Sequence, residues 1–132
     1  MRLLADTHVL VHWLVDDKRL SRRQRQALRK VGDGAPLAVS DISLWEIAVL
    51  CERRRLRLPL SLRDWLEHAT AAPLVERVGI GPAVAAEVAS LPASFHRDPA
   101  DRIIVATARV LGAELLTSDE RIIDAEIVPT IS

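Results

Sequence analysis

The chain has 132 residues, 49% of them hydrophobic, and carries 18 basic and 18 acidic side chains, so its formal net charge is zero. This length suits a single domain, 1–132, and the apolar content excludes a mainly disordered chain. No apolar run approaches the roughly 20 residues of a membrane-spanning helix, and Asp6 comes too early for a signal peptide. We therefore expect a cytoplasmic protein with no membrane partner.

Cys51 is the only cysteine, so neither an internal disulfide nor a cysteine-based zinc site can form. Its apolar surroundings favour inert packing. Basic residues gather at 18–30 and 53–57, which is typical of solvated arginine-rich surfaces, with contact to RNA or to a partner as the alternative. With no Tyr, one Phe and three Trp, we expect no aromatic platform for stacked bases.

The first half of the chain alternates short apolar runs with helical patterns. Residues 2–5 predict a buried strand and Thr7–Val15 a helix, followed by a polar connection, "DDKRLS". Residues 21–34 predict a basic helix that Ser21 caps and that a glycine, Gly32 or Gly34, ends. A strand at 36–40 precedes a helix over 40–55, capped by Ser40 or Asp41, with an expected apolar face formed by Ile42, Trp45, Val49 and Leu50.

The second half continues this alternation. Residues 61–71 predict a helix capped by Ser61, 73–80 a strand, and 81–91 a helix. The strongest helical pattern is 97–113, with Asp98 as N-cap, Pro99 in the first position and Gly112 at the end. A strand at 114–118, a helical turn at 119–124 and an edge strand at 127–129, ended by Pro129, complete the chain. This order predicts an α/β fold, a three-layer α/β/α sandwich with a central, mainly parallel sheet.

Four acidic residues stand out against this pattern. Asp6 directly follows the first strand, and Asp119 directly follows "LLTS". Ligands bind beyond the carboxyl ends of parallel strands, so these two carboxylates meet at one edge of the sheet if their strands are neighbours. Asp101 lies in the first turn of the 97–113 helix, where the helix dipole alone favours an acid, as it does at Asp119. Glu46 lies inside "SLWEIAVL", where it is solvated, paired with a nearby arginine, or functional.

The four acids together favour a metal site. Two carboxylates about 5 Å apart repel by about 3 kcal/mol at an effective dielectric near 20. A crevice holding four of them must either retain protons or bind divalent cations. Ligation by oxygen alone suits Mg²⁺ or Mn²⁺, and such an ion activates water and offsets charge on a phosphoryl oxygen.

Four segments in order, "LLADTHVLVHWL", "SLWEIA", "HRDPADRIIVATA" and "LLTSDERI", resemble the PIN-domain ribonucleases, and in particular the VapC toxins of bacterial toxin–antitoxin pairs. The resemblance spans almost the whole chain. It implies a three-layer α/β/α fold and Mg²⁺- or Mn²⁺-dependent endoribonuclease activity, in which a metal-activated water cleaves RNA. It also implies a cognate antitoxin and a homodimer. The family's catalytic and metal-binding acids fall on Asp6, Glu46, Asp101 and Asp119.

The resemblance leaves the individual roles partly open. We expect Asp6 and Asp101 to be the principal metal ligands, Asp119 to complete the site directly or through water, and Glu46 to orient a water or act as a base. The family also places hydroxyl residues next to the first and last acids, here Thr7 and Ser118. Asp98 is expected to cap its helix and shape the first turn, and an exposed Arg102 to meet a phosphate or a partner. His96 is a weaker candidate for a phosphate contact.

Competing interpretations fit less well. His8 and His12 are spaced like half a zinc site, but no third ligand has an obvious place and the glutamate of the HExxH pattern is missing. A haloacid-dehalogenase-type phosphatase needs a second Asp where His8 stands, and a receiver domain needs a late lysine, whereas the only lysines are Lys18 and Lys30. A housekeeping nuclease of the same fold and a catalytically silent module that binds RNA or protein remain open.

Overall fold

The computed structural model describes residues 2–132, and its central layer is one sheet of five parallel strands in the order β3-β2-β1-β4-β5. β1 (Leu3–Ala5) lies at the centre. On one side of it lie β2 (Leu37–Ser40) and β3 (Val75–Val78), and on the other β4 (Glu114–Leu116) and β5 (Thr130–Ile131). The predicted parallel sheet is confirmed, and all of its pairings are parallel.

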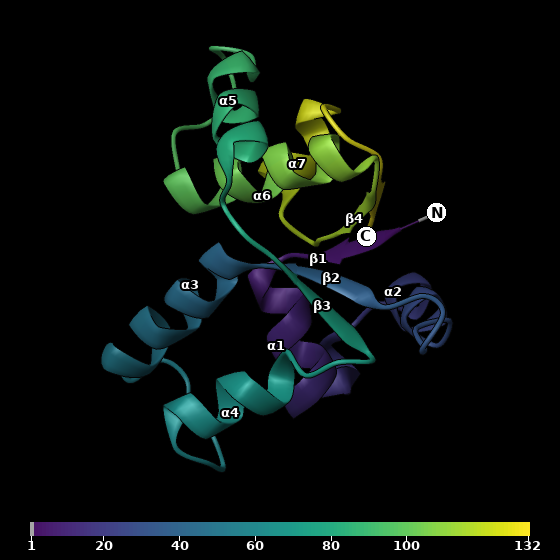
Figure 1. Cartoon of the computed structure of the whole chain (residues 1–132), viewed down its shortest axis with the longest axis vertical. Coiled ribbons are helices and arrows are strands. Elements are labelled where there is room, and N and C mark those ends of the chain that lie inside the picture. The colour runs from purple at the N-terminus through teal and green to yellow at the C-terminus, as the bar shows by residue number, and fades with distance from the viewer. Residues whose placement is uncertain (1) are drawn as a thin grey trace.

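Helices cover both faces of this sheet, which confirms the three-layer α/β/α architecture (Figure 1). One face packs against α1 (Thr7–Val15), α2 (Arg22–Leu28), α3 (Asp41–Glu52) and α4 (Leu62–Ala69), with a 3₁₀ turn, η1 (Asp17–Arg19), between α1 and α2. The other face packs against α6 (Pro99–Leu111) and α7 (Glu120–Ala125), and α5 (Pro82–Ser90) packs on α6. Within residues 2–132, every helix is too short or too polar to cross a bilayer.

The core is divided by the sheet into two clusters. Side chains of a strand alternate between its faces, so Ala5 contributes to the cluster with Val9 and Ile47, while Leu4 contributes to the cluster with Ile104. Leu4 and Ala5 are both fully buried. Strand β1 is therefore covered on both sides, and the first polar side chain after it, Asp6, is held at the edge of a dry interior.

Most of the helix ends follow the predicted capping residues. Ser21 forms a capping box with Gln24, and the Ser61 hydroxyl accepts from the backbone N–H of Asp64. Asp98 caps α6, and Gly112 ends that helix in the left-handed conformation (φ 62°), which glycine adopts without steric cost.

Two predicted boundaries are wrong. Helix α2 ends at Leu28 with Arg29 as its C-cap, before either glycine, and Gly32 instead pairs with Ala35 in a tight turn. Pro129 does not end the last strand but precedes it, and β5 begins at Thr130. There the proline carbonyl accepts from the backbone N–H of Leu115 (2.9 Å), and proline is tolerated where a strand begins.

The apolar face expected for α3 is only partly covered. The residues of α3 that are buried are Ser43 and Ile47, whereas Trp45 is 60% exposed. Ser43 lies against Thr7 at the start of α1, and its small side chain lets these two helices approach closely. Of the expected face, Ile42 packs against the core cluster that contains Leu4.

Candidate active site

The site lies at the carboxyl ends of β1 and β4. The chain places β2 and β3 on one side of β1 and then β4 and β5 on its other side, so the order of strands changes sides between β1 and β4. The backbone N–H of Asp6 donates to the carbonyl of Leu116 (3.0 Å), which fixes the two strand ends side by side. A cavity of about 440 Å³ opens at this position, as expected for ligand sites in parallel sheets. Its wall includes the acids and hydroxyl residues predicted from the sequence, namely Asp6, Thr7, Glu46, Asp98, Asp101, Ser118 and Asp119.

Asp6 is the most deeply placed acid of the site, with 6% of its surface exposed. As the N-cap of α1, its Oδ1 accepts from the backbone N–H of Val9 (2.8 Å), and its Oδ2 accepts from the Thr117 hydroxyl (2.5 Å). Burial raises the pKa of Asp6, although both hydrogen bonds oppose the rise. Its carboxylate is thus oriented by two donors at the cost of losing its hydration.

Glu46 reaches the cavity from α3. Its Oε1 accepts a short hydrogen bond from the Thr7 hydroxyl, which also lies 2.9 Å from Ser43 Oγ. Burial raises the pKa of Glu46, the Thr7 bond lowers it, and the charge of Asp98 raises it further. Along residues 2–132 no ion pair joins Glu46 to an arginine, so the alternative of a simple surface pair does not hold.

Asp98 and Asp101 enter the cavity from the first turn of α6. Asp98 Oδ1 accepts from the backbone N–H of Asp101 (3.0 Å), which confirms its predicted role as helix cap. Burial raises the pKa of Asp101 to about 7, with further contributions from the negative charges of Asp98, Asp119 and Glu46. The electrostatic cost of gathering these acids is therefore concentrated at Asp101.

Asp119 is the acid that already has a cationic partner. It caps α7, and Arg121 donates to both of its oxygens, through Nε to Oδ1 (3.3 Å) and through Nη2 to Oδ2 (3.0 Å). Burial tends to raise the pKa of Asp119, but the hydrogen bonds and charge of Arg121 hold it below its usual value. The same Nη2 lies 3.5 Å from Oδ2 of Asp101, so one guanidinium bridges two acids of the site.

Arg102 does not face the cavity, contrary to the expectation from the sequence. It is 9% exposed, and its Nη1 donates to the carbonyls of Phe95 (3.1 Å) and His96 (3.3 Å). The guanidinium therefore holds the segment that precedes α6. His96 lies beside the site, with Nε2 3.4 Å from Asp101 Oδ2.

Two residues near the site were missed by the sequence analysis. The Thr117 hydroxyl donates to Asp6 and accepts from the backbone N–H of Asp119 (3.1 Å), so it links two acids. Gln24, 1% exposed, donates from Nε2 to Ser118 Oγ (3.0 Å) and to the Ile131 carbonyl (3.3 Å). The run "LLTS" signalled a hydroxyl at the strand end, but Gln24 looked like an ordinary residue of a basic helix.

The donor set fits a hard divalent cation with bound water. Among residues 2–132, no cluster of three or more His, Cys, Asp or Glu side chains is arranged to hold a metal ion. Mg²⁺ does not need one, because it retains several waters and binds through one or two carboxylates. Burial is the main cause of the raised pKa values of Asp6, Glu46 and Asp101, and a bound cation would favour their charged forms.

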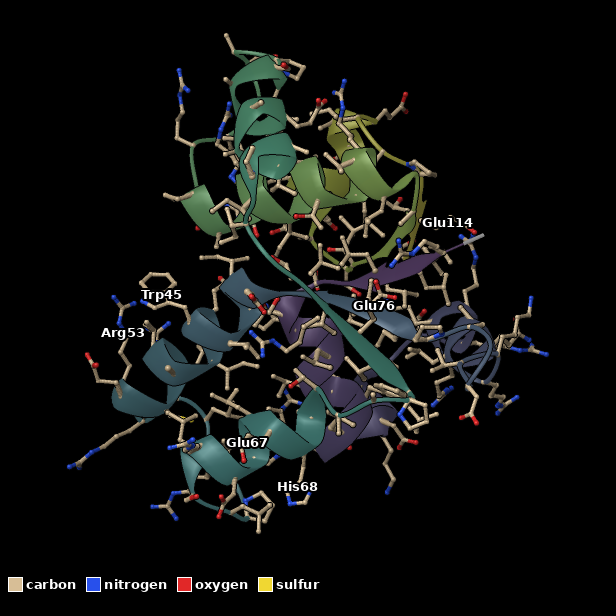
Figure 2. All side chains as sticks on the ribbon, in the orientation of Figure 1. Trp45, Arg53, Glu67, His68, Glu76 and Glu114 are labelled. Atoms are coloured by element: carbon tan, nitrogen blue, oxygen red, sulfur yellow. The ribbon has the colours of Figure 1, made fainter. Side chains whose placement is uncertain are left out.

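An apolar groove adjoins the acidic cavity along α3. Its apolar lining includes Ile42, Trp45, Val49 and Leu50, and it shares His8, Glu46 and Asp98 with the acidic cavity. Figure 2 shows Trp45 and Arg53 projecting outward from α3. The apolar face expected for α3 thus lines a groove next to the acids.

Known proteins are similar to this chain in sequence. The PIN domain model matches residues 3–128. Ribonuclease VapC22 of Mycobacterium tuberculosis is 42% identical over 120 residues, which cover 91% of this chain and 88% of that protein.

Solved structures share the same fold. The VapBC2 structure from Rickettsia felis, bound to a DNA fragment from its promoter, aligns with a TM-score of 0.72, 13% identity and coverage of 98% of this chain and 97% of that one. A toxin–antitoxin complex from Klebsiella pneumoniae aligns with a TM-score of 0.70, 21% identity and coverage of 98% and 96%. Together with the family match and the 42% identical relative, the acidic site at the carboxyl edge of a parallel sheet leads to one conclusion: the chain is a VapC-type member of the PIN-domain family.

Proposed function

We propose that this protein is a Mg²⁺- or Mn²⁺-dependent endoribonuclease that acts as the cytoplasmic toxin of a toxin–antitoxin pair, with residues 1–132 forming one nuclease domain. The observation that carries the proposal is the convergence of Asp6, Glu46, Asp101 and Asp119, from four separate elements, on one cavity. The similarity to Ribonuclease VapC22 supports RNA as the substrate.

Each acid has a distinct part in this proposal. Asp6 and Asp101 would hold the ion, and Asp119 would complete the site directly or through water. When bound, the ion supplies positive charge that polarises a phosphoryl oxygen and lowers the pKa of water. The deep burial of Asp6 and the concentration of negative charge at Asp101 support their assignment as the main ligands.

Glu46 is the group best placed to take a proton from the attacking water. Its Oε1 accepts from the Thr7 hydroxyl, which leaves Oε2 free to accept a proton, and Glu46 lines the cavity. A raised pKa makes the carboxylate a stronger base than an ordinary glutamate, which favours proton transfer near neutral pH. Thr7 would act as a positioning residue that fixes this carboxylate.

RNA cleavage with and without metal tests the activity. Purified protein is incubated with a mixed-sequence single-stranded RNA in the presence of Mg²⁺, Mn²⁺ or EDTA. We expect cleavage with either ion, none with EDTA, and none for Asp6→Asn. Cleavage in EDTA, or full activity of Asp6→Asn, would contradict the proposal, and Asp33→Asn, an exposed acid outside the cavity, is the matched control.

The partner in this proposal is a cognate antitoxin. The groove along α3 supports it, because a segment lying across Trp45 and Val49 would continue into the cavity over Glu46. The similar structures from Rickettsia felis and Klebsiella pneumoniae are toxin–antitoxin complexes. We expect co-expression with the product of the adjacent upstream gene to yield a complex, and Trp45→Arg to disrupt it without abolishing RNA cleavage.

We also propose that the chain forms a homodimer. Leu14 and Val15, at the end of the apolar run of α1, are 43% and 45% exposed and offer apolar surface for a second copy. Light scattering of the purified protein is expected to give twice the mass of 14.6 kDa. A Leu14→Glu variant that remains a dimer would place the interface elsewhere, and a monomeric wild type would contradict the dimer.

A further inference from the structure

Arg121 is the one cation that touches two acids of the site in the described part of the chain. Its guanidinium spans Asp119 Oδ2 (3.0 Å) and Asp101 Oδ2 (3.5 Å). The residue is nevertheless exposed, with 62% of its side-chain surface accessible, so no packing holds it in this position. Such exposed ion pairs are weak and exchange partners readily.

We infer that Arg121 is an internal counter-ion that changes partners: it neutralises Asp101 and Asp119 while the site lacks metal, and it binds a phosphate of the RNA backbone once metal has taken those oxygens. Only the phosphate contact rests on the proposed nuclease function. The neutralisation of Asp101 and Asp119 depends on competition between the Arg121 guanidinium and a cation for the same carboxylate oxygens.

The contacts of Asp119 make this competition direct. Both of its carboxylate oxygens accept hydrogen bonds from the Arg121 side chain, and Oδ1 also accepts from the backbone N–H of Arg121 (2.9 Å). An ion that binds Asp119 through Oδ2 must displace Nη2. The backbone contact survives this exchange, so α7 keeps its cap while the side chain is released.

The released guanidinium lies between two cavities, at a position where it can contact a phosphate of bound RNA. Arg121 lines the acidic cavity and also a second cavity, of about 330 Å³, which includes Phe95, His96 and Asp124. A strand of RNA that crosses the acidic cavity toward the second one passes over it. The planar guanidinium matches two phosphate oxygens at once, which lysine cannot do.

The first test measures metal binding without RNA. Isothermal titration of Mn²⁺ into wild type, Arg121→Gln and Arg63→Gln compares the site with and without its counter-ion; Arg63 is an exposed arginine, paired with Glu67, that lines neither cavity. We expect Arg121→Gln to bind Mn²⁺ about threefold or more tightly than wild type, and Arg63→Gln to match wild type. Unchanged or weaker binding in Arg121→Gln would overturn the inference.

The second test measures RNA binding at saturating Mn²⁺. The probe is a fluorescent single-stranded phosphorothioate RNA, which keeps its backbone charge and resists hydrolysis. We expect weaker binding by Arg121→Gln, a slope of log K against log salt that is smaller by about 0.7, and partial rescue by Arg121→Lys. Equal affinity and slope in wild type and Arg121→Gln would overturn the phosphate contact. A wild type that binds no RNA would contradict the proposed function. The Mn²⁺ titration would still show whether Arg121 competes with metal for Asp101 and Asp119.

Discussion

Thr117 and Asp6, which are 111 positions apart in the sequence, are joined by a hydrogen bond of 2.5 Å from the Thr117 hydroxyl to Asp6 Oδ2. The same hydroxyl accepts from the backbone N–H of Asp119. This buried threonine therefore ties the acid after β1 to the acid after β4. It sets the relative position of two proposed metal ligands without being one itself.

Removal of this hydroxyl is expected to impair the site more than the fold. In Thr117→Val the Asp6 carboxylate loses one of its two donors, and we expect metal affinity or RNA cleavage to fall about 10–100-fold. Thr117→Ser keeps the hydroxyl and should stay within a few fold of wild type. Mn²⁺ titration and cleavage rates measure both variants, and equal activity of Thr117→Val and Thr117→Ser would show that the hydroxyl has no positioning role.

Glu46→Gln tests the proton acceptor. The amide keeps the size of the side chain but cannot take a proton, so we expect the rate of RNA cleavage to fall by about 10²–10⁴-fold. Glu52→Gln, an exposed position on the same helix, is the matched control and should cleave normally. Circular dichroism checks that both variants fold, and a Glu46→Gln variant with a near-normal rate would remove Glu46 from the mechanism.

The raised pKa of Asp101 predicts a dependence of stability on pH in the metal-free protein. With a folded-state pKa of about 7 and an unfolded value near 3.8, the native state binds more protons between these pH values. Stability therefore falls as pH rises from about 4 through 7, and the raised pKa values of Asp6 and Glu46 act in the same direction.

Asp101→Asn removes the contribution of Asp101 to this dependence. We expect its Tm to exceed that of wild type at pH 8 in EDTA, and the difference to shrink at pH 5. Addition of Mg²⁺ at pH 8 should raise the Tm of wild type and leave that of the variant nearly unchanged. Differential scanning fluorimetry measures both effects, and a destabilised Asp101→Asn at pH 8 would contradict the electrostatic account.

Arg102 is expected to matter for stability. Arg102→Leu leaves the carbonyls of Phe95 and His96 without their donor, and we expect a loss of about 2–3 kcal/mol in the free energy of unfolding. Urea unfolding measures this loss. Arg97→Leu, an exposed arginine in the same segment, should change stability by less than about 0.5 kcal/mol. A loss in Arg102→Leu no larger than in Arg97→Leu would show that these hydrogen bonds contribute nothing.

The sequence was sufficient to single out the acids that line the cavity, partly from local structure and partly from the resemblance to the PIN-domain ribonucleases. Asp6 ends a strand that is apolar on both faces, and Asp98 precedes a proline at a helix start. What the sequence could not provide is the strand order. Only the pairing of β1 with β4 explains why Thr117 contacts Asp6 and why Arg121 reaches Asp101.

The errors have a common physical origin. Apolar periodicity shows that a helix has an apolar face but not what covers it, so the sequence did not reveal that Trp45 lies on the surface. Likewise, Arg102 is a charged residue whose burial depends on two carbonyls from a neighbouring loop. Each case is decided by tertiary contacts that local pattern does not encode.

The central claim is that acids from distant parts of the chain together hold one divalent cation, and anomalous diffraction from a crystal soaked in Mn²⁺ tests it most directly. We predict a strong peak in the acidic cavity, within coordination distance of Asp6 and Asp101. The absence of a peak there at saturating Mn²⁺, or peaks only at other surfaces of the protein, would contradict the account.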